Sequence, residues 1–435
     1  MDARFLRRVP FVVFKERNTV MDQSAHGAAA AATPLAIPRW EFIALAAAMM
    51  ALNALAIDIM LPGLQEIGAG LGVEDHNARQ YVITAYIVGF GLAQLFFGPL
   101  SDRFGRRGPL MVGLAIYVAA AFACAFAPSF AILLALRFVQ GLGAAATRVI
   151  AMSIVRDAYG GRAMAEVMSL VFMVFMVIPV IAPGIGQVMM MFGNWHLIFI
   201  CMGVLSLIFT IWAWLRLPET LHEEYRRPFT FQAVTEGFRI VVTNRISILY
   251  TIAMTAIFGA LFGFINSAQQ IYIGIYDVGA MFPVYFAGVA GLMAVSSFVN
   301  SRLVGRFGMR RLAHGAMLGF TLITGVAFVL SLIGPLPLWA FMGLFALAMV
   351  QFSWVGSNFN ALAMEPLGHV AGTASSVQGF LQTVGGGLVG AMIGQAFDGT
   401  VTPLSAGYFV AGVVAVACVL LAERGRLFRA QNPAV

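Results

Sequence analysis

The sequence predicts an all-α integral membrane protein in which twelve transmembrane helices form two related six-helix halves. Hydrophobic residues make up 60% of the 435-residue chain and charged residues only 10%. A soluble domain averages nearer one half and one quarter. Twelve apolar runs are long enough, at about 20 residues, to cross the hydrocarbon core of a bilayer. An arginine-rich loop also recurs at corresponding positions in the two halves.

The twelve predicted spans follow one another with short polar gaps. They lie at 41–62, 80–100, 109–127, 130–153, 164–190, 195–216, 246–273, 280–301, 311–333, 336–361, 370–396 and 404–422. The segment before them, 1–39, is predicted to be a disordered cytoplasmic tail, with Met21 as an alternative start. Its apolar piece "VPFVVF" is too short for the core of a signal peptide.

Arginines mark one side of the membrane. They gather in the loops after spans two, four, six and eight: Arg103, Arg106, Arg107, Arg156, Arg162, Arg226, Arg227, Arg302, Arg306, Arg310 and Arg311. The positive-inside rule therefore predicts that both termini are cytoplasmic. A net charge of +7 spread over such loops indicates topology rather than nucleic-acid binding. Cys124, Cys201 and Cys418 lie far apart within apolar runs, which predicts neither a disulfide nor a metal site.

The longest polar interval divides the chain in two. Four of its apolar residues recur at helical spacing, which predicts a short amphipathic helix in the cytoplasmic interface: Phe231, Val234, Phe238 and Val241. The predicted organisation is a tail (1–39), an N-terminal bundle (40–216), a linker (217–245), a C-terminal bundle (246–422) and a second cytoplasmic tail (423–435).

The loop after span two, "DRFGRR" at Asp102–Arg107, is echoed after span eight by "GRFGMRR" at Gly305–Arg311. Repeated halves place the substrate site of a transporter at their interface, near the bilayer midplane. The first loop resembles the major facilitator superfamily pattern G-x-x-x-D-R-x-G-R-R at Gly98, Asp102, Arg103, Gly105, Arg106 and Arg107. Four further stretches are similar to the Bcr/CflA branch of drug:proton antiporters: "AIDIMLPGL", "LRFVQGLGAAATRVIAMSIVRD", "PVIAPGIGQ" and "GTASSVQGFLQTVGGGLVG".

This resemblance implies the major facilitator fold and a monomer in the bacterial inner (plasma) membrane. It implies no cofactor, because the proton gradient drives transport, and small molecules, protons and the lipid bilayer as partners. The leading hypothesis is proton-coupled efflux of small amphipathic compounds, including drugs, by alternating access. The alternative is a dedicated proton-coupled transporter of one metabolite, such as an amino acid, a siderophore or a sugar derivative. An enzyme is disfavoured because the sequence lacks HExxH, P-loop and paired-carboxylate patterns, and a channel because no filter sequence appears.

Asp58 lies about one turn from the outer end of span one. An acid at the centre of a membrane helix costs about 2.5–3.5 kcal/mol on insertion scales. Asp58 is therefore either hydrated near the outer surface, where it helps to end the helix at Pro62, or it carries protons or contacts substrate. Arg137, at a similar depth in span four, is its expected partner, and the resemblance ties the arginine of "LRFVQG" to proton coupling. The alternative is a purely structural ion pair.

Arg148 lies eleven residues beyond Arg137, on nearly the same helix face and about 16 Å lower. It either binds an anionic group or snorkels to the cytoplasmic surface. Some multidrug members of the superfamily carry a second acid two turns before the span-one aspartate, where this chain has Met50. One acid against two arginines disfavours dications as substrates and leaves neutral, zwitterionic and anionic compounds open.

In span five, Pro179, Pro183 and Gly186 predict a bend and the close approach of another backbone. In the resembling exporters this element is associated with antiport, whereas ordinary helix packing is the alternative. Other polar and aromatic residues are candidates for the substrate cavity, although each type is more often used in packing: Gln140, Tyr86, Phe175, Asn266, Gln269, Asn358, Gln378, Gln382, Tyr250 and Phe262.

The charged cluster around Asp102 is predicted to be a conformational latch. Asp102 is expected to meet the positive N-terminal end of span eleven near Gly372–Ala374, held by Arg106, which in turn pairs with Asp157. These contacts would form when the cytoplasmic side is closed. Because Gly305 stands where Asp102 does in the first half, the latch is expected on one side only. The alternative is that the arginines simply hold a loop in the cytoplasm.

Overall fold

The computed structural model describes residues 37–159, 161–221, 223–226 and 231–428, and all regular elements in these residues are helical. The α-helices are α1 (Arg39–Asp58), α2 (Leu64–Gly70), α3 (Tyr81–Phe104), α4 (Arg107–Ala125), α5 (Phe130–Ala158), α6 (Gly161–Phe192), α7 (Trp195–Arg216), α8 (Phe231–Thr243), α9 (Arg245–Gln269), α10 (Phe282–Phe307), α11 (Met309–Ile333), α12 (Leu338–Met364), α13 (Ala371–Phe380), α14 (Gly386–Gln395) and α15 (Thr402–Ala422). Short 3₁₀ or π turns are η2 (Leu61–Gly63), η3 (Ala78–Gln80), η4 (Glu223–Tyr225), η5 (Gln270–Ile275), η6 (Gly279–Met281), η7 (Glu365–Val370) and η8 (Leu381–Gly385).

A helix occupies each of the twelve predicted spans. Within the described chain, ten helical segments are long and apolar enough to cross a membrane. The other two predicted spans are filled by α6 and by the continuous run of α13, η8 and α14. Membrane-spanning chains satisfy their backbone hydrogen bonds within each helix, so long apolar runs of this kind fold as helices. The prediction of an all-α membrane fold is therefore confirmed.

The repeat seen in the sequence is also a repeat of backbone geometry. Helix α3 ends at Phe104 and α10 ends at Phe307, and each is followed by a glycine in the left-handed region. Gly105 has φ 88° and Gly308 has φ 81°. A residue with a Cβ is strained there, so glycine is what allows both helices to stop before an arginine-rich turn.

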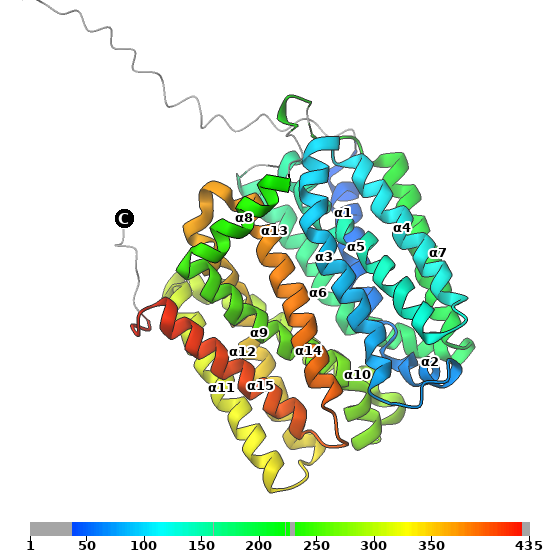
Figure 1. The fold of residues 1–435 in the computed structure, drawn as a ribbon, viewed down its shortest axis with the longest axis vertical. Coiled ribbons are helices and arrows are strands. Elements are labelled where there is room, and N and C mark those ends of the chain that lie inside the picture. The colour runs from blue at the N-terminus through cyan, green and yellow to red at the C-terminus, as the bar shows by residue number, and fades with distance from the viewer. Residues whose placement is uncertain (1–36, 160, 222, 227–230, 429–435) are drawn as a thin grey trace, which may run out of the picture.

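The helices form two bundles that meet along two seams (Figure 1). In one seam α3 packs along α13, η8 and α14, and in the other α6 packs against α10. Glycines bring the first pair close together: a Cβ on Gly91 would lie 2.5 Å from the Val384 side chain, and one on Gly387 would lie 2.6 Å from Ile87. Small residues of this kind are what membrane helices use for close contact.

The predicted amphipathic helix is present as α8 and packs on protein. Phe238 meets Phe380 of α13 edge to face, with ring centroids 5.6 Å apart. Val241 is buried in an apolar cluster with Leu95 of α3, and the other buried members of this cluster are Leu367, Ala374 and Val377. The side chains of Phe231 and Val234, and the tail 1–36, lie outside the described residues. Helix α8 thus packs on the C-terminal bundle and joins an apolar cluster that includes Leu95 of the N-terminal bundle.

Two names are used below for the opposite ends of the bundle. The arginine end carries Arg106 and Arg310, next to the ends of α3 and α10. The amide end carries Asn77 and Gln395, next to the start of α3 and the end of α14.

Candidate functional site

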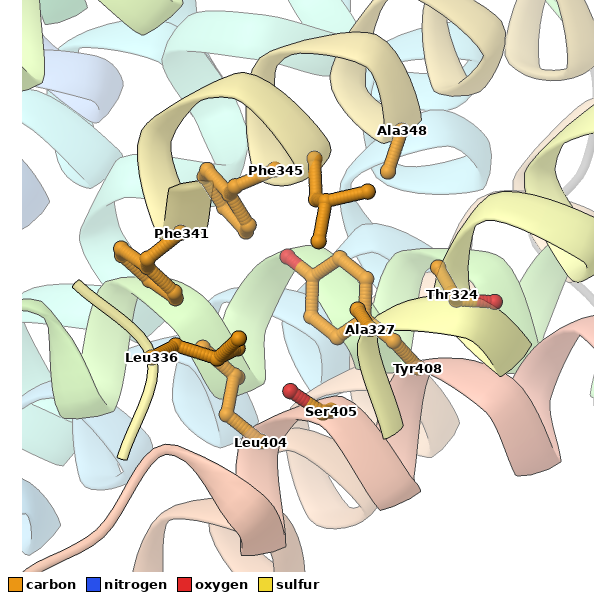
Figure 2. A pocket seen from close by; sticks show the side chains of 10 residues that line it. Thr324, Ala327, Leu336, Phe341, Phe345, Ala348, Leu404, Ser405 and Tyr408 are labelled. Atoms are coloured by element: carbon orange, nitrogen blue, oxygen red, sulfur yellow. The ribbon is translucent and has the colours of Figure 1, made fainter. Parts of the chain in front are cut away.

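One pocket lies inside the C-terminal bundle, between α11, α12 and α15 (Figure 2). Its walls are mostly apolar and aromatic, including Phe341, Phe345 and Leu404. The hydroxyl of Tyr408 is buried in this region and has no hydrogen-bond partner in the part of the chain that the structure describes. This pocket lies within one bundle, away from the two seams.

Arg137 is fully buried, and each of its three guanidinium nitrogens donates a hydrogen bond within the N-terminal bundle. Its Nε donates to the Val82 carbonyl at 3.2 Å, Nη1 to Oε1 of Gln140 at 2.6 Å, and Nη2 to the Ala56 carbonyl at 2.9 Å. The guanidinium also lies 4.5 Å from the centre of the Tyr86 ring, a cation–π contact. This arginine joins α1, α3 and α5.

The expected ion pair between Asp58 and Arg137 is absent, and this prediction is wrong for the conformation described. Arg137 donates a hydrogen bond to the carbonyl of Ala56, which lies two residues before Asp58. Two residues correspond to about 200° around a helix, so the side chains of Ala56 and Asp58 leave α1 on different faces. Asp58 is only 4% exposed, and its Oδ1 has no hydrogen-bond partner in the described chain. Such burial does not fit the alternative of a hydrated surface carboxylate.

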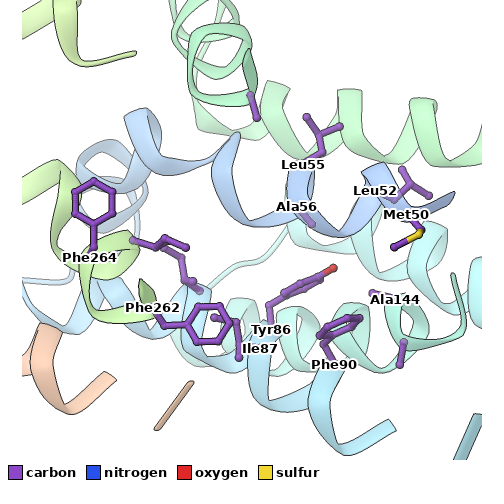
Figure 3. Packing of buried hydrophobic residues seen from close by; sticks show 14 of the residues in the cluster. Met50, Leu52, Leu55, Ala56, Tyr86, Ile87, Phe90, Ala144, Phe262 and Phe264 are labelled. Atoms are coloured by element: carbon purple, nitrogen blue, oxygen red, sulfur yellow. The ribbon is translucent and has the colours of Figure 1, made fainter. Parts of the chain in front are cut away.

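A second polar chain, which the sequence did not single out, runs behind Tyr86. The Tyr86 hydroxyl donates to Oδ1 of Asn53 at 3.3 Å, and Nδ2 of Asn53 donates to Oγ1 of Thr147 at 2.8 Å. Figure 3 shows Tyr86 beside Phe90, with Phe262 of the other bundle next to Ile87. An asparagine inside an apolar run was the signal that could have identified this chain.

Arg148 differs from Arg137 in having no hydrogen bond or ion pair in the described part of the chain. Its guanidinium lies 5.8 Å from the centre of the Phe90 ring. The residue is partly exposed although it belongs to the middle of α5.

The amide end is closed by uncharged hydrogen bonds between the bundles, here called the amide clasp. Nδ2 of Asn77 donates to the carbonyls of Gln395 and Phe397 at 3.1 and 2.9 Å, and Nε2 of Gln395 donates back to the Asn77 carbonyl at 2.6 Å. Nε2 of Gln270 donates to Oδ1 of Asn77 at 2.7 Å, and Nε2 of Gln80 donates to Oε1 of Gln270 at 2.6 Å. The amide clasp thus connects the start of α3 with the ends of α9 and α14. Its residues are Asn77, Gln80, Gln270, Gln395 and Phe397.

Two predicted cavity residues lie at or behind this clasp. Nε2 of Gln269 donates to the Pro62 carbonyl at 3.2 Å, which is another contact between the bundles. Asn266 is 1% exposed, and neither polar atom of its amide has a hydrogen-bond partner among the described residues. Its Cβ lies 3.0 Å from the position of a Cβ on Gly394, and Gln80 approaches the same position. Asn266 is therefore inside the contact between the bundles.

Other cavity candidates make bonds within the C-terminal bundle. Nδ2 of Asn358 donates to Asn300 at 2.9 Å, and Nε2 of Gln378 donates to Ser247 at 3.1 Å. Gln382 has a 3.5 Å contact with Asn360, and the hydroxyl of Tyr250 donates to Glu423 at 2.8 Å. The side chain of Phe175 lies outside the described residues. These bonds connect neighbouring helices of one bundle.

Arg106 at the arginine end forms the ion pairs expected of it. It is 3% exposed, and it contacts Oδ1 of Asp102 at 2.5 Å and Oδ2 of Asp157 at 2.6 Å. Burial alone would lower the pKa of Arg106, but its hydrogen bonds to Asp157 and Asp102 raise it above the usual value. Glu219 accepts from the backbone N–H groups of Arg106 and Arg107 at 2.7 and 3.1 Å.

The remaining residues of the predicted latch surround this cluster. Arg103 lies over the ring of Phe104 at 5.3 Å. A Cβ on Gly98 would lie 3.3 Å from Oγ of Ser376, so α3 and α13 are in contact here. Asp102 is expected to contact the start of α13 near Gly372–Ala374; the side chains of residues 372 and 373 lie outside the described residues, so this contact stays a prediction.

The one-sided latch stays a prediction, but the C-terminal bundle has a charged cluster of its own. Arg310 contacts Glu365 at 2.8 Å and Glu423 at 3.0 Å. Glu365 follows α12, much as Asp157 lies in the last turn of α5. Gly305 stands where the N-terminal bundle has Asp102 and carries no carboxylate. The second carboxylate that contacts Arg310 comes instead from Glu423, which follows α15.

Helix α6 continues through Pro179 and Pro183 and makes the predicted close approach at Gly186. A Cβ on Gly186 would collide with the carbonyl oxygen of Ile59. Since Ile59 follows Asp58, the glycine lets α6 pack directly against the end of α1 that carries the buried acid.

Comparison with known proteins agrees with this architecture. The model of the Major Facilitator Superfamily matches residues 42–390. The chain is 30% identical over 365 residues to the "Bicyclomycin resistance protein homolog" of Haemophilus influenzae, covering 84% of this chain and 90% of the relative. It is 29% identical over 370 residues to "Multidrug resistance protein D" of Escherichia coli, covering 81% and 89%.

Solved structures show the same fold. The partially occluded inward open xylose transporter XylE of E. coli matches with a TM-score of 0.67 at 12% identity, covering 88% of this chain and 97% of that one. An inward-facing bacterial homolog of the human lysosomal transporter Spinster matches with a TM-score of 0.64 at 15% identity, covering 88% and 94%.

Proposed function

Because the chain belongs to the Major Facilitator Superfamily and to its Bcr/CflA-like branch, we propose that it exports small amphipathic compounds in exchange for protons. It is a multi-pass membrane protein whose substrates are small molecules. Relatives named for bicyclomycin and multidrug resistance support drug-like cargo. The arginine end is the cytoplasmic one in this proposal, because arginine-rich loops are retained inside.

The observation that carries the proton coupling is Asp58. An ionised carboxylate is costly to bury without a partner, whereas a protonated carboxyl is neutral and can be buried. Asp58 is buried with an unpartnered oxygen while the amide clasp is closed. In the proposed cycle Asp58 takes up a proton when the amide end is open, and that proton allows the bundles to close over it.

Arg137 and Gly186 support Asp58 in different ways. Arg137 is bound to three acceptors in the N-terminal bundle, so it fixes the end of α1 without neutralising the acid. Gly186 brings the backbone of α6 against Ile59, so a movement of α6 is transmitted to the segment that holds Asp58. Proton release toward the arginine end then accompanies binding of the compound to be exported.

The test is proton movement in inverted membrane vesicles that contain the full-length protein. A pH-sensitive dye reports the gradient while a panel of neutral, zwitterionic and anionic drugs is added. Wild type is expected to release protons with several compounds and Asp58→Asn with none. Glu74→Gln, which removes an exposed acid from the amide end, is the matched control and should behave as wild type.

Unchanged proton release in Asp58→Asn would overturn the role of the acid, and no release in wild type with any compound would overturn proton exchange. A response of wild type to one compound alone would favour the dedicated metabolite transporter.

A further inference from the structure

Arg148 has donors that the protein leaves unused. A guanidinium carries five N–H donors, and burying them without acceptors is unfavourable. Arg137 on the same helix meets this need with three hydrogen bonds, but Arg148 has none in the described part of the chain. Since Arg148 is partly exposed, the protein does not fully enclose its side chain.

The side chain of Arg148 is directed away from the arginine end of α5. Helix α5 continues for ten more residues, to Ala158, which is about 15 Å at 1.5 Å per residue. An arginine side chain has six bonds of about 1.5 Å from Cα to its terminal nitrogens and spans no more than about 8 Å. The Arg148 guanidinium instead lies near the Phe90 ring, and the Phe90 backbone lies beside Gly141, seven residues nearer the start of α5, so the side chain does not extend toward the arginine end in this conformation.

Among the described side chains, no acid forms an ion pair with Arg148. Asp58 lies close to the level of Arg137, because Arg137 donates to the Ala56 carbonyl. Arg148 is eleven residues from Arg137, or about 16 Å along α5. The proton carried by Asp58 and the positive charge of Arg148 are thus at separate depths.

The surroundings of Arg148 are aromatic and border the contact between the bundles. The Phe90 ring lies 5.8 Å from the guanidinium. One turn further along α3, Nε2 of Gln94 donates across the seam to Oγ1 of Thr383 at 3.2 Å. A free cation beside an aromatic face at such a contact suits an aromatic compound with an anionic substituent.

We propose that Arg148 binds the anionic group of the exported compound, so that this transporter prefers small aromatic anions, such as sulfonates or carboxylates, over their uncharged analogues. The inference rests on the proposed export function and specifies its substrate class. The compound supplies the counter-charge that the N-terminal bundle lacks, while the Phe90 ring contacts its apolar part.

The test compares two radiolabelled probes that share one aromatic scaffold. 8-Anilinonaphthalene-1-sulfonate carries an anion and N-phenyl-1-naphthylamine does not. Equilibrium binding of each is measured with the purified full-length protein, without a proton gradient. The variants are Arg148→Gln and Arg148→Lys, and the matched control is Arg156→Gln, which removes an exposed arginine from the same helix.

Arg148→Gln is expected to weaken binding of the sulfonate roughly tenfold to a hundredfold, as for loss of a charged hydrogen bond, and to leave the neutral probe within threefold. Arg148→Lys should retain part of the preference, because lysine keeps the charge but not the planar fork. The control should change neither probe.

Equal weakening of both probes, unchanged binding of the sulfonate, or no preference for it in wild type would each overturn the proposal. Binding is measured without a proton gradient, so its result does not depend on proton exchange. The substrate preference and the proposed export function can therefore fail separately.

Discussion

Replacing Asn77 by alanine is expected to open the amide end of the transporter. The Asn77 side chain makes three hydrogen bonds to the C-terminal bundle, two through Nδ2 and one through Oδ1, at 3.1, 2.9 and 2.7 Å. A hydrogen bond contributes about 0.5–1.5 kcal/mol net, so the closed state loses roughly 1.5–4.5 kcal/mol relative to the open state. The backbone bond from Gln395 remains, so we expect a loss near the lower end, about 2 kcal/mol, or roughly thirtyfold in the equilibrium.

The measurement is the labelling rate of a cysteine placed behind the clasp. Asn266→Cys serves as reporter in a protein whose three free cysteines are replaced by serine, and a membrane-impermeant maleimide is added from the amide end. Asn266 is buried in the closed state, so Asn77→Ala should raise the rate at least tenfold. Asn194→Ala, an exposed asparagine at the same end with no capping bond, is the control. Rates within twofold of the parent would refute the idea that the clasp holds this end closed.

Three further changes test other parts of the structure. Asp102→Asn should abolish transport with normal membrane insertion, because it removes a charge from the cluster at the arginine end; misinsertion would instead support a topological role. Gly186→Ala forces a Cβ into a carbonyl of α1 and should destabilise the protein by about 1–3 kcal/mol, seen as a lower Tm. Arg310→Gln removes the two ion pairs of a largely buried arginine and should cost about 3–5 kcal/mol, seen as a lower Tm, whereas Arg306→Gln at an exposed site should leave Tm unchanged.

The spans and the ion pair of Arg106 with Asp157 could be predicted because each depends on information carried along the chain. A run of about 20 apolar residues has one good structure in a bilayer. Charges at the same end of neighbouring helices are drawn together once that order is known. The partners of Arg137 could not be predicted in this way. Sequence spacing gives depth in the membrane, but two of its three acceptors are backbone carbonyls, which every residue possesses.

The amide clasp was missed for a related reason. Asn77, Gln80 and Gln395 lie at the ends of spans, where polar residues are ordinary. Only the fold shows that Asn77 meets residues more than 300 positions away. Asn266 and Gln269 were identified as polar groups inside an apolar run, but whether such a group lines a cavity or closes an end depends on the packing of the bundles.

The two ends of the molecule are held by different kinds of interaction, and this difference suits alternating access. At the arginine end the ion pairs lie within a bundle: Arg106 with Asp102 and Asp157, and Arg310 with Glu365 and Glu423. They keep each bundle rigid and need not break when the bundles separate. At the amide end the bonds run between bundles and are uncharged, so each is individually weak. A few kcal/mol from binding a proton or a compound is then enough to open the clasp, while the charged clusters stay intact.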